Sequence, residues 1–230
     1  MVNETRARRG SAREPNRAAQ PVRGAARVRC VMANPLARAE FRFAAHNLHQ
    51  LPADTVREVA IAGRSNAGKS SALNAICHQK SLARTSKTPG RTQQLVYFEA
   101  QPERFLVDLP GYGYAKVPEQ LRAHWQAFIN QYFEIRQSLV GLVVVMDIRH
   151  PLKDYDRQML GYAANRGLPA HALLTKADKL SRGAQGNALL AVRKDLASAF
   201  GDSVSVQTFS GESKLGVEEA RAVVGGWLQL

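Results

Sequence analysis

Apolar and amphipathic stretches alternate along this chain from residue 56 to the C-terminus. Short, mostly apolar runs predict six strands, over residues 56–62, 95–99, 105–108, 142–148, 170–175 and 204–209. Between and after them, apolar residues recur at helical spacing, which predicts helices over residues 70–78, 118–137, 153–165, 186–200 and 217–228. Strands that alternate with helices of this length are typical of a mostly parallel sheet with helices on both faces. We therefore expect an α/β fold built on about six strands.

The chain has no apolar segment long enough to span a bilayer. Its longest uninterrupted apolar run, residues 139–146, is far shorter than the roughly 18 residues that a membrane-spanning helix needs, and it suits a buried strand. The N-terminus lacks the apolar core of a secretion signal. The two cysteines, Cys30 and Cys77, match no metal-ligand spacing, which argues against a zinc module or a secreted disulfide scaffold. These features predict a cytoplasmic protein.

The first 31 residues differ in composition from the rest. They hold eight Arg, no Lys and two Glu, with almost no large apolar side chains, so we expect a basic, disordered extension. This segment is a basic arm for RNA, an Arg-rich organelle presequence, or a stretch that precedes a natural start at Met32. Residues 32–55 then form an N-terminal lead-in, and residues 56–230 form the folded domain.

The charge of the chain is strongly positive. Lys and Arg number 32 against 19 acidic residues, which gives a net charge of +13. Without residues 1–31 the net charge would still be +7. An excess of this size favours a polyanionic partner, with a nucleic acid preferred over an anionic membrane surface.

A glycine-rich motif of the form G-x-x-x-x-G-K-S lies between the first predicted strand and the first predicted helix. Backbone N–H groups of such a loop and the helix N-terminus attract phosphate, and the glycines let the backbone approach it closely. Lys69 would reach the β- and γ-phosphates, and Ser70 would bind Mg²⁺. The motif predicts a nucleotide site formed by Gly63, Arg64, Ser65, Asn66, Ala67, Gly68, Lys69, Ser70 and the adjacent Ser71.

A second motif, D-x-x-G, follows the third predicted strand. Its residues are Asp108, Leu109, Pro110 and Gly111. A carboxylate at the end of that strand can hold Mg²⁺ through a water molecule, and the N–H of Gly111 can meet a γ-phosphate without a Cβ in the way. Pro-Gly after a strand is also a common turn, so the motif gains its meaning from the phosphate loop that precedes it.

Two further segments would form a guanine pocket. Asp178 can accept hydrogen bonds from the N1–H and the 2-amino group of guanine, a pair of donors that adenine lacks, and the Lys176 stem can lie along the base. Without the phosphate loop, Lys176 and Asp178 would be interpreted as a solvated charge pair in a loop. With it, we expect a base site formed by Thr175, Lys176, Ala177 and Asp178, and by Phe209, Ser210 and Gly211, whose backbone would face the guanine oxygen.

Taken together, these motifs resemble the YihA/YsxC/EngB family of ribosome-biogenesis GTP-binding proteins, which are P-loop GTPases of the translation-factor type. The resemblance runs from about residue 51 to the C-terminus. It is carried by GRSNAGKSSALNAI from Gly63, LARTSKTPGRTQ from Leu82, VDLPGYGYAKVP from Val107, MDIRHPLKDYD from Met146 and TKADKL from Thr175. The chain differs from the usual pattern at Gly211 and Glu212, which replace a commoner pair of small residues.

The resemblance implies further roles for residues of the site. Thr92 would bind Mg²⁺ and sense the γ-phosphate, and it would act in hydrolysis together with Lys69 and Gly111. The first switch would be lined by Gly90, Arg91, Gln93 and Gln94. The resemblance also implies association with the large ribosomal subunit or its precursor, and a role in cell division. We expect GTP or GDP and Mg²⁺ as ligands, a monomer, and neither DNA nor a membrane as partner.

One expected catalytic group is missing. Ras-like GTPases place a water-orienting Gln directly after D-x-x-G, whereas this chain has Tyr112. We therefore expect slow unassisted hydrolysis, with the missing group supplied by the ribosome, by a reordered switch or by a monovalent cation such as K⁺ near Asn66. Two other functions stay open from the sequence: a constitutive RNA-binding scaffold in which nucleotide is structural, and a GTPase coupled to a membrane or division apparatus.

Overall fold

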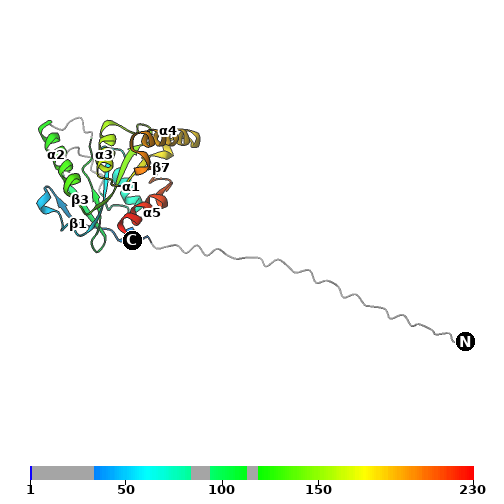
Figure 1. Cartoon of the computed structure of the whole chain (residues 1–230), viewed down its shortest axis with the longest axis horizontal. Helices are drawn as coiled ribbons and strands as arrows, with labels where there is room; N and C mark the ends of the chain where they lie inside the picture. The colour runs from blue at the N-terminus through cyan, green and yellow to red at the C-terminus, as the bar shows by residue number, and fades with distance from the viewer. Residues whose placement is uncertain (2–33, 84–93, 113–118) are drawn as a thin grey trace. The chain divides into compact units, whose positions relative to one another are not determined.

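The computed structural model describes the chain outside residues 2–33, 84–93 and 113–118 (Figure 1). The chain divides into two units, Met1–Met32 and Ala33–Leu230. The helices and strands described below all belong to the second unit. In the part of the chain that the structure describes, none of the helices has the length and apolar character needed to cross a membrane.

The second unit is built on a single sheet of seven strands among the described residues. Their order across the sheet is β1-β3-β4-β2-β5-β6-β7. The five strands from β4 to β7 in this order are parallel, and β3 and β1 continue the sheet in antiparallel pairing. The bounds are Glu40–Ala45 (β1), Arg57–Gly63 (β2), Leu95–Gln101 (β3), Arg104–Asp108 (β4), Leu139–Asp147 (β5), Ala170–Thr175 (β6) and Val204–Thr208 (β7). The predicted α/β fold with a mostly parallel sheet is confirmed.

Helices cover both faces of this sheet. One apolar core contains side chains of α2, α3 and α4, and the other contains side chains of α1, α5 and the short 3₁₀ helix η1. The bounds are Lys69–Ile76 (α1), Glu119–Ile135 (α2), Asp154–Asn165 (α3), Arg182–Phe200 (α4), Val217–Leu228 (α5) and Pro35–Arg38 (η1). Helix α4 begins at Arg182 rather than at residue 186, because the Ser181 hydroxyl accepts a hydrogen bond from the N–H of Ala184 and caps the helix.

Strand β1 was not predicted from the sequence. It lies in the 32–55 lead-in and pairs with β3 at the edge of the sheet. Its register shifts between Phe41 and Phe43, so its apolar residues do not follow the simple alternation that identifies a strand in a sequence. Phe43 stacks on Tyr97 of β3, with 4.5 Å between ring centroids, and Leu36 of η1 is fully buried. The lead-in is therefore an integrated part of the fold.

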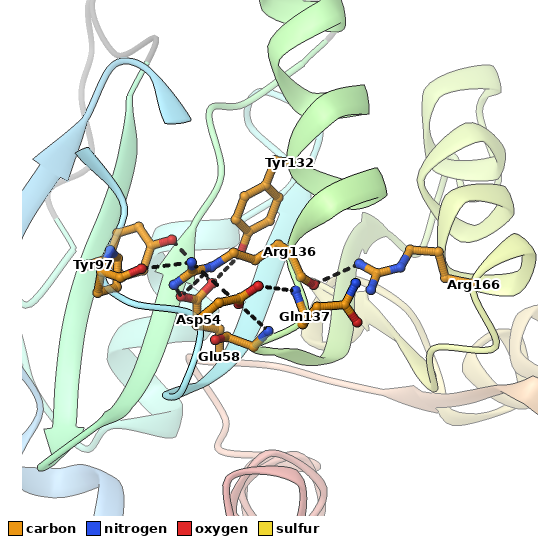
Figure 2. Close-up of polar contacts among 9 residues, drawn as sticks. Asp54, Glu58, Tyr97, Tyr132, Arg136, Gln137 and Arg166 are labelled. Carbon is orange, nitrogen blue, oxygen red and sulfur yellow. Dashed lines mark hydrogen bonds and ion pairs between the residues drawn. The ribbon is translucent and has the colours of Figure 1, made fainter. Parts of the chain in front are cut away.

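A buried polar cluster joins α2 to the amino end of β2 (Figure 2). Glu58 is fully buried, and Arg136, which follows α2, donates from Nε to its Oε1 at 2.9 Å. The hydroxyls of Tyr132 and Tyr97 donate to Glu58 Oε2 at 2.9 and 3.2 Å. Asp54 forms an ion pair with Arg136 at 3.4 Å. The C-terminal end of α2 is thus anchored at the end of β2 that lies opposite Gly63.

Candidate nucleotide-binding site

The predicted motifs meet at one edge of the sheet, where the parallel strands end. Strands β2, β4 and β6 end at Gly63, Asp108 and Thr175, the first residues of the three motif segments. In the sheet, β4 and β5 lie on either side of β2. Ligands of open α/β sheets bind at the carboxyl ends of the strands where neighbouring connections diverge in this way. The topology therefore places a ligand site above β2.

The loop between β2 and α1 has the backbone shape that its glycines allow. A Cβ added to Gly63 would lie 2.9 Å from the carbonyl oxygen of Val145. At the start of the loop the backbone therefore passes so close to β5 that a side chain would clash. Gly68 has a φ of 92°, a left-handed conformation that glycine adopts at no steric cost. Asn66 is also left-handed, with a φ of 62°. The turn directs the N-terminus of α1 towards the position that a phosphate would occupy.

Lys69 and Asp108 come together at this edge. The Lys69 ammonium forms an ion pair with Asp108 Oδ1, and both side chains are largely buried. The backbone after Asp108 stays beside β2, because the N–H of Leu109 donates to the Ile61 carbonyl at 3.0 Å. Ser70 follows Lys69 in the first turn of α1. The Asp108 carboxylate and the Ser70 hydroxyl are oxygen donors of the type that Mg²⁺ prefers, so the residues at this edge fit that ion.

The base-binding segment after β6 is tied to the phosphate loop. The Thr175 hydroxyl contacts the Ala67 carbonyl and also lies 2.9 Å from the Met146 carbonyl. The Lys176 ammonium donates to the Asn66 carbonyl at 2.6 Å. Lys176 is itself left-handed, with a φ of 58°. These contacts hold the base and phosphate halves of the site in one geometry.

Asp178 is positioned by the segment that follows β7. The Ser210 hydroxyl lies 2.6 Å from Asp178 Oδ1, and the N–H of Ser213 donates to Ser210 Oγ at 3.1 Å. Lys179 forms an ion pair with Asp178 at 3.1 Å. The hydrogen bond from Ser210, followed by the contact with Lys179, lowers the pKa of the Asp178 carboxyl below its usual value. An ionised carboxylate is the acceptor that the two guanine donors require.

An open pocket of about 980 Å³ lies between α1 and the segments that follow β6 and β7, and it reaches the phosphate loop at Gly68. Its lining includes Gly68, Ser71, Lys176, Asp178, Phe209 and Gly211. A Cβ added to Gly211 would lie 3.2 Å from the Ser71 carbonyl oxygen, so a small residue is favoured where the β7 segment passes α1. The volume of the pocket lies within the range of small-molecule sites in proteins.

Comparisons with known proteins agree with this geometry. The sequence profile of the family described as 50S ribosome-binding GTPases matches residues 58–176. The probable GTP-binding protein EngB of Xanthomonas campestris pv. campestris (strain 8004) is 71% identical over 192 residues, which cover 84% of this chain and 93% of the relative. The corresponding protein of Stenotrophomonas maltophilia (strain K279a) is 72% identical over 193 residues, covering 84% and 96%. The chain belongs to the EngB family of GTP-binding proteins.

Solved structures support the same fold for this EngB-family chain. A crystal structure of a probable GTP-binding protein engB has a TM-score of 0.61 at 16% identity and covers 75% of this chain and 98% of its own. A bacterial selenocysteine-specific elongation factor, EF-Sec, has a TM-score of 0.54 at 18% identity and covers 76% and 29%. The predicted P-loop GTPase fold is confirmed, and family membership makes the chain a GTP-binding GTPase.

Several predicted residues of this EngB-family GTPase are not placed in the site. Gly90, Arg91, Thr92 and Gln93 lie outside the described residues. Gln94 precedes β3, where its Nε2 lies 2.6 Å from Nε2 of His46. The predicted roles of these five residues as a switch stay predictions.

Asp147 lies in the segment MDIRHPLKDYD that carries the resemblance, but the sequence analysis gave it no role in the site. It ends β5 and forms an ion pair with Lys176 at 3.0 Å. Arg149 donates from Nε to Asp147 Oδ1 at 2.9 Å and contacts Oδ2 at 2.7 Å. The carboxylate therefore helps to hold the lysine that lies between the phosphate loop and the base segment. An acid at the end of a predicted apolar strand was the available signal, but its pairing with Lys176 depends on the order of β5 and β6 in the sheet.

Proposed function

We propose that this EngB-family GTPase hydrolyses GTP slowly with Mg²⁺ and acts as a nucleotide-dependent switch in assembly of the large ribosomal subunit, a role that normal cell division requires. The observation that supports it most is the joined site, in which Lys176 links Asn66 of the phosphate loop to the base segment. The matching family is described as 50S ribosome-binding GTPases, and the positive charge suits an rRNA surface.

In this proposal, the residues of the chain bind and orient the triphosphate. Lys69 leaves Asp108 and meets the β- and γ-phosphates, and the N–H of Gly111 meets the γ-phosphate. Ser70 and Thr92, with Asp108 through water, would hold Mg²⁺. When bound, the ion neutralises the charge that develops on the phosphates. Fixed N–H groups and the Lys69 ammonium stabilise the same charge without reorganising during the reaction.

Slow hydrolysis follows from the residue after Gly111. The Tyr112 side chain is 3% exposed, so it does not serve as the water-orienting group that Gln supplies in Ras-like proteins. K⁺ near Asn66 is one proposed replacement, and the ribosome or a reordered switch are the others. The left-handed backbone conformation of Asn66 is a second, structural explanation for an asparagine at this position, because asparagine tolerates that conformation.

The K⁺ proposal is tested by GTP turnover in potassium and in sodium at one ionic strength. Turnover should be faster in potassium, and Asn66→Ala should lose that acceleration while still binding GTP. Asn187→Ala, which alters an exposed asparagine of α4, is the control and should keep it. Equal rates in the two salts for the wild type would rule out the cation.

The switch itself is tested by sedimentation with large-subunit particles in GDP, in a non-hydrolysable GTP analogue and without nucleotide. We expect the most protein in the particle fraction with the analogue. Asp178→Asn should abolish that preference at limiting nucleotide, whereas Asp195→Asn on the exposed surface of α4 should keep it. Equal sedimentation in all three conditions would favour the RNA-binding scaffold, and no sedimentation would contradict both.

A further inference from the structure

Tyr112 has a defined structural role in place of the missing glutamine. Its hydroxyl donates to Asp156 Oδ1 at 2.8 Å, and its ring centroid lies 5.8 Å from that of Tyr155. Burial raises the pKa of the Tyr112 hydroxyl well above its usual value, so the hydroxyl remains a donor at neutral pH. The Tyr112 side chain therefore packs against and hydrogen-bonds to the first turn of α3.

The backbone of Tyr112 forms hydrogen bonds with the phosphate loop. The N–H of Ser65 donates to the Tyr112 carbonyl at 2.8 Å, and the N–H of Tyr112 donates to the Gly63 carbonyl at 3.4 Å. A Cβ added to Gly111 would lie 3.7 Å from the nitrogen of Ser65 and from the oxygen of Gly63. The Gly111 backbone thus lies against the loop and is held there from the Tyr112 side.

Asp156 provides a rigid acceptor for this link. It is 2% exposed, and its Oδ2 accepts a hydrogen bond from the N–H of Lys153 at 3.0 Å. Both carboxylate oxygens therefore have partners, one at the cap of α3 and one at Tyr112. Met159 and Leu160 pack α3 into the core below the cap. A displacement of Tyr112 would have to break a buried hydrogen bond or move a packed helix.

We propose that Tyr112 is a positioning residue for the γ-phosphate and sets the preference of the site for GTP over GDP. The inference rests on the proposed function, because it takes the N–H of Gly111 as the γ-phosphate donor. Tyr112, fixed between the phosphate loop and Asp156, holds that N–H in place before the nucleotide arrives. GDP lacks the γ-phosphate, so the contact that Tyr112 supports contributes to the affinity for GTP alone.

The test compares Tyr112→Phe with the wild type in the full chain. Dissociation constants are measured for GDP and for a non-hydrolysable GTP analogue, both with Mg²⁺. Tyr112→Phe should weaken analogue binding on the order of tenfold and change GDP binding by less than about twofold. Tyr132→Phe is the matched control, because it also removes a buried hydroxyl that donates to a carboxylate, at the opposite end of β2. It should leave the ratio of the two constants unchanged.

Two variants of the acceptor give a second measurement. Asp156→Asn can keep both contacts, because its amide oxygen can accept from the N–H of Lys153 while its NH₂ group donates to the Tyr112 hydroxyl oxygen. It should keep most of the preference for the analogue, whereas Asp156→Ala should lose it. This comparison decides the matter if Tyr112→Phe does not fold by circular dichroism. An unchanged ratio, or equal weakening of both nucleotides, would overturn the inference and leave the proposed function intact. A wild type that binds neither guanine nucleotide would overturn the proposed function instead.

Discussion

Asp147 keeps its negative charge because basic side chains surround it. Hydrogen bonds from Arg149 are the largest cause and the ion pair with Lys176 adds to them, and together they hold the pKa of Asp147 well below its ordinary 3.8. A pKa that is lower in the folded state means that the ionised carboxylate favours folding. This contribution is present at pH values above 3.8 and is lost as the pH falls below that value.

Replacing Arg149 should therefore shift the titration of Asp147. Arg149→Ala is expected to raise the pKa of Asp147 towards 3.8, as followed by NMR of the carboxyl carbon over the acid range in which the fold persists. Arg157→Ala is the control, because that arginine pairs with Asp195 and does not touch Asp147. An Asp147 titration that is the same in Arg149→Ala and in the wild type would contradict the assignment.

Asp178 should decide which base the site accepts. Asp178→Asn replaces an acceptor with an amide that also presents N–H groups to guanine, so GTP and GDP should both bind about 1–3 kcal/mol more weakly in calorimetric titrations. Asp202→Asn, at the exposed turn before β7, should leave both affinities unchanged. Equal affinity of the wild type for ATP and GTP would refute guanine selection by this carboxylate.

Single residues of the site were predictable where a motif gave the side chain a chemical role of its own. Lys69, Asp108 and Asp178 were predicted because each lies in a motif with a chemical reason. The contribution of the Ser210 hydroxyl to Asp178 was missed, since the sequence suggested only a backbone role there. The Asp147–Lys176 pair was missed because it joins the ends of two different strands, and no motif spacing records that contact.

Among the elements, α2 depends on an anchor outside its own sequence. Arg136 follows its last turn, and its guanidinium is the charged partner of the fully buried Glu58. Arg136→Ala would leave that carboxylate without its charged partner, so the free energy of unfolding should fall by about 3–5 kcal/mol in urea titrations. Arg157→Ala, which removes an exposed ion pair with Asp195 and a hydrogen bond to the Leu152 carbonyl, should cost no more than about 2 kcal/mol. A loss as small as that of the control would show that Glu58 does not need its partner.

Elements with a strong period were predictable, and elements defined by pairing were not. The stripe of apolar residues at helical spacing predicted residues 118–137, and the structure has α2 over Glu119–Ile135. Strand β1 escaped prediction because its bulge interrupts the alternation and because its place depends on β3, which lies far along the chain. The beginning of α4 depended on a serine cap that a composition-based boundary overlooks.

At the scale of the whole molecule, positive charge is spread over both units. Removing residues 1–31 would lower the net charge from +13 to +7. The truncated protein should bind rRNA more weakly but should still bind, and its log–log salt slope should fall in magnitude by about 0.7–0.9 for each lost phosphate contact. Filter binding across a salt series measures both quantities.

A full-length variant with its eight N-terminal arginines, Glu4 and Glu14 all changed to glutamine has the same net charge of +7 as the truncated protein, so it separates charge from length. It should behave like the truncated protein, because counterion release depends on charge. Loss of all binding on truncation would place the RNA element in the extension instead of in the GTPase unit.

The contacts of Arg136 fix the C-terminal end of α2, so a rigid tilt of this helix would pivot about that end. Its 17 residues give the helix a length of about 25 Å. With the C-terminal end held on Glu58, any tilt of the helix is magnified towards Glu119, the end that follows the D-x-x-G segment. A rotation of roughly 10° about the anchor would move that end by about 4 Å, whereas Arg136 would hardly move. Because the buried cluster fixes the end of α2 that is far from the nucleotide site, a tilt of the helix displaces mainly the end that follows the D-x-x-G segment.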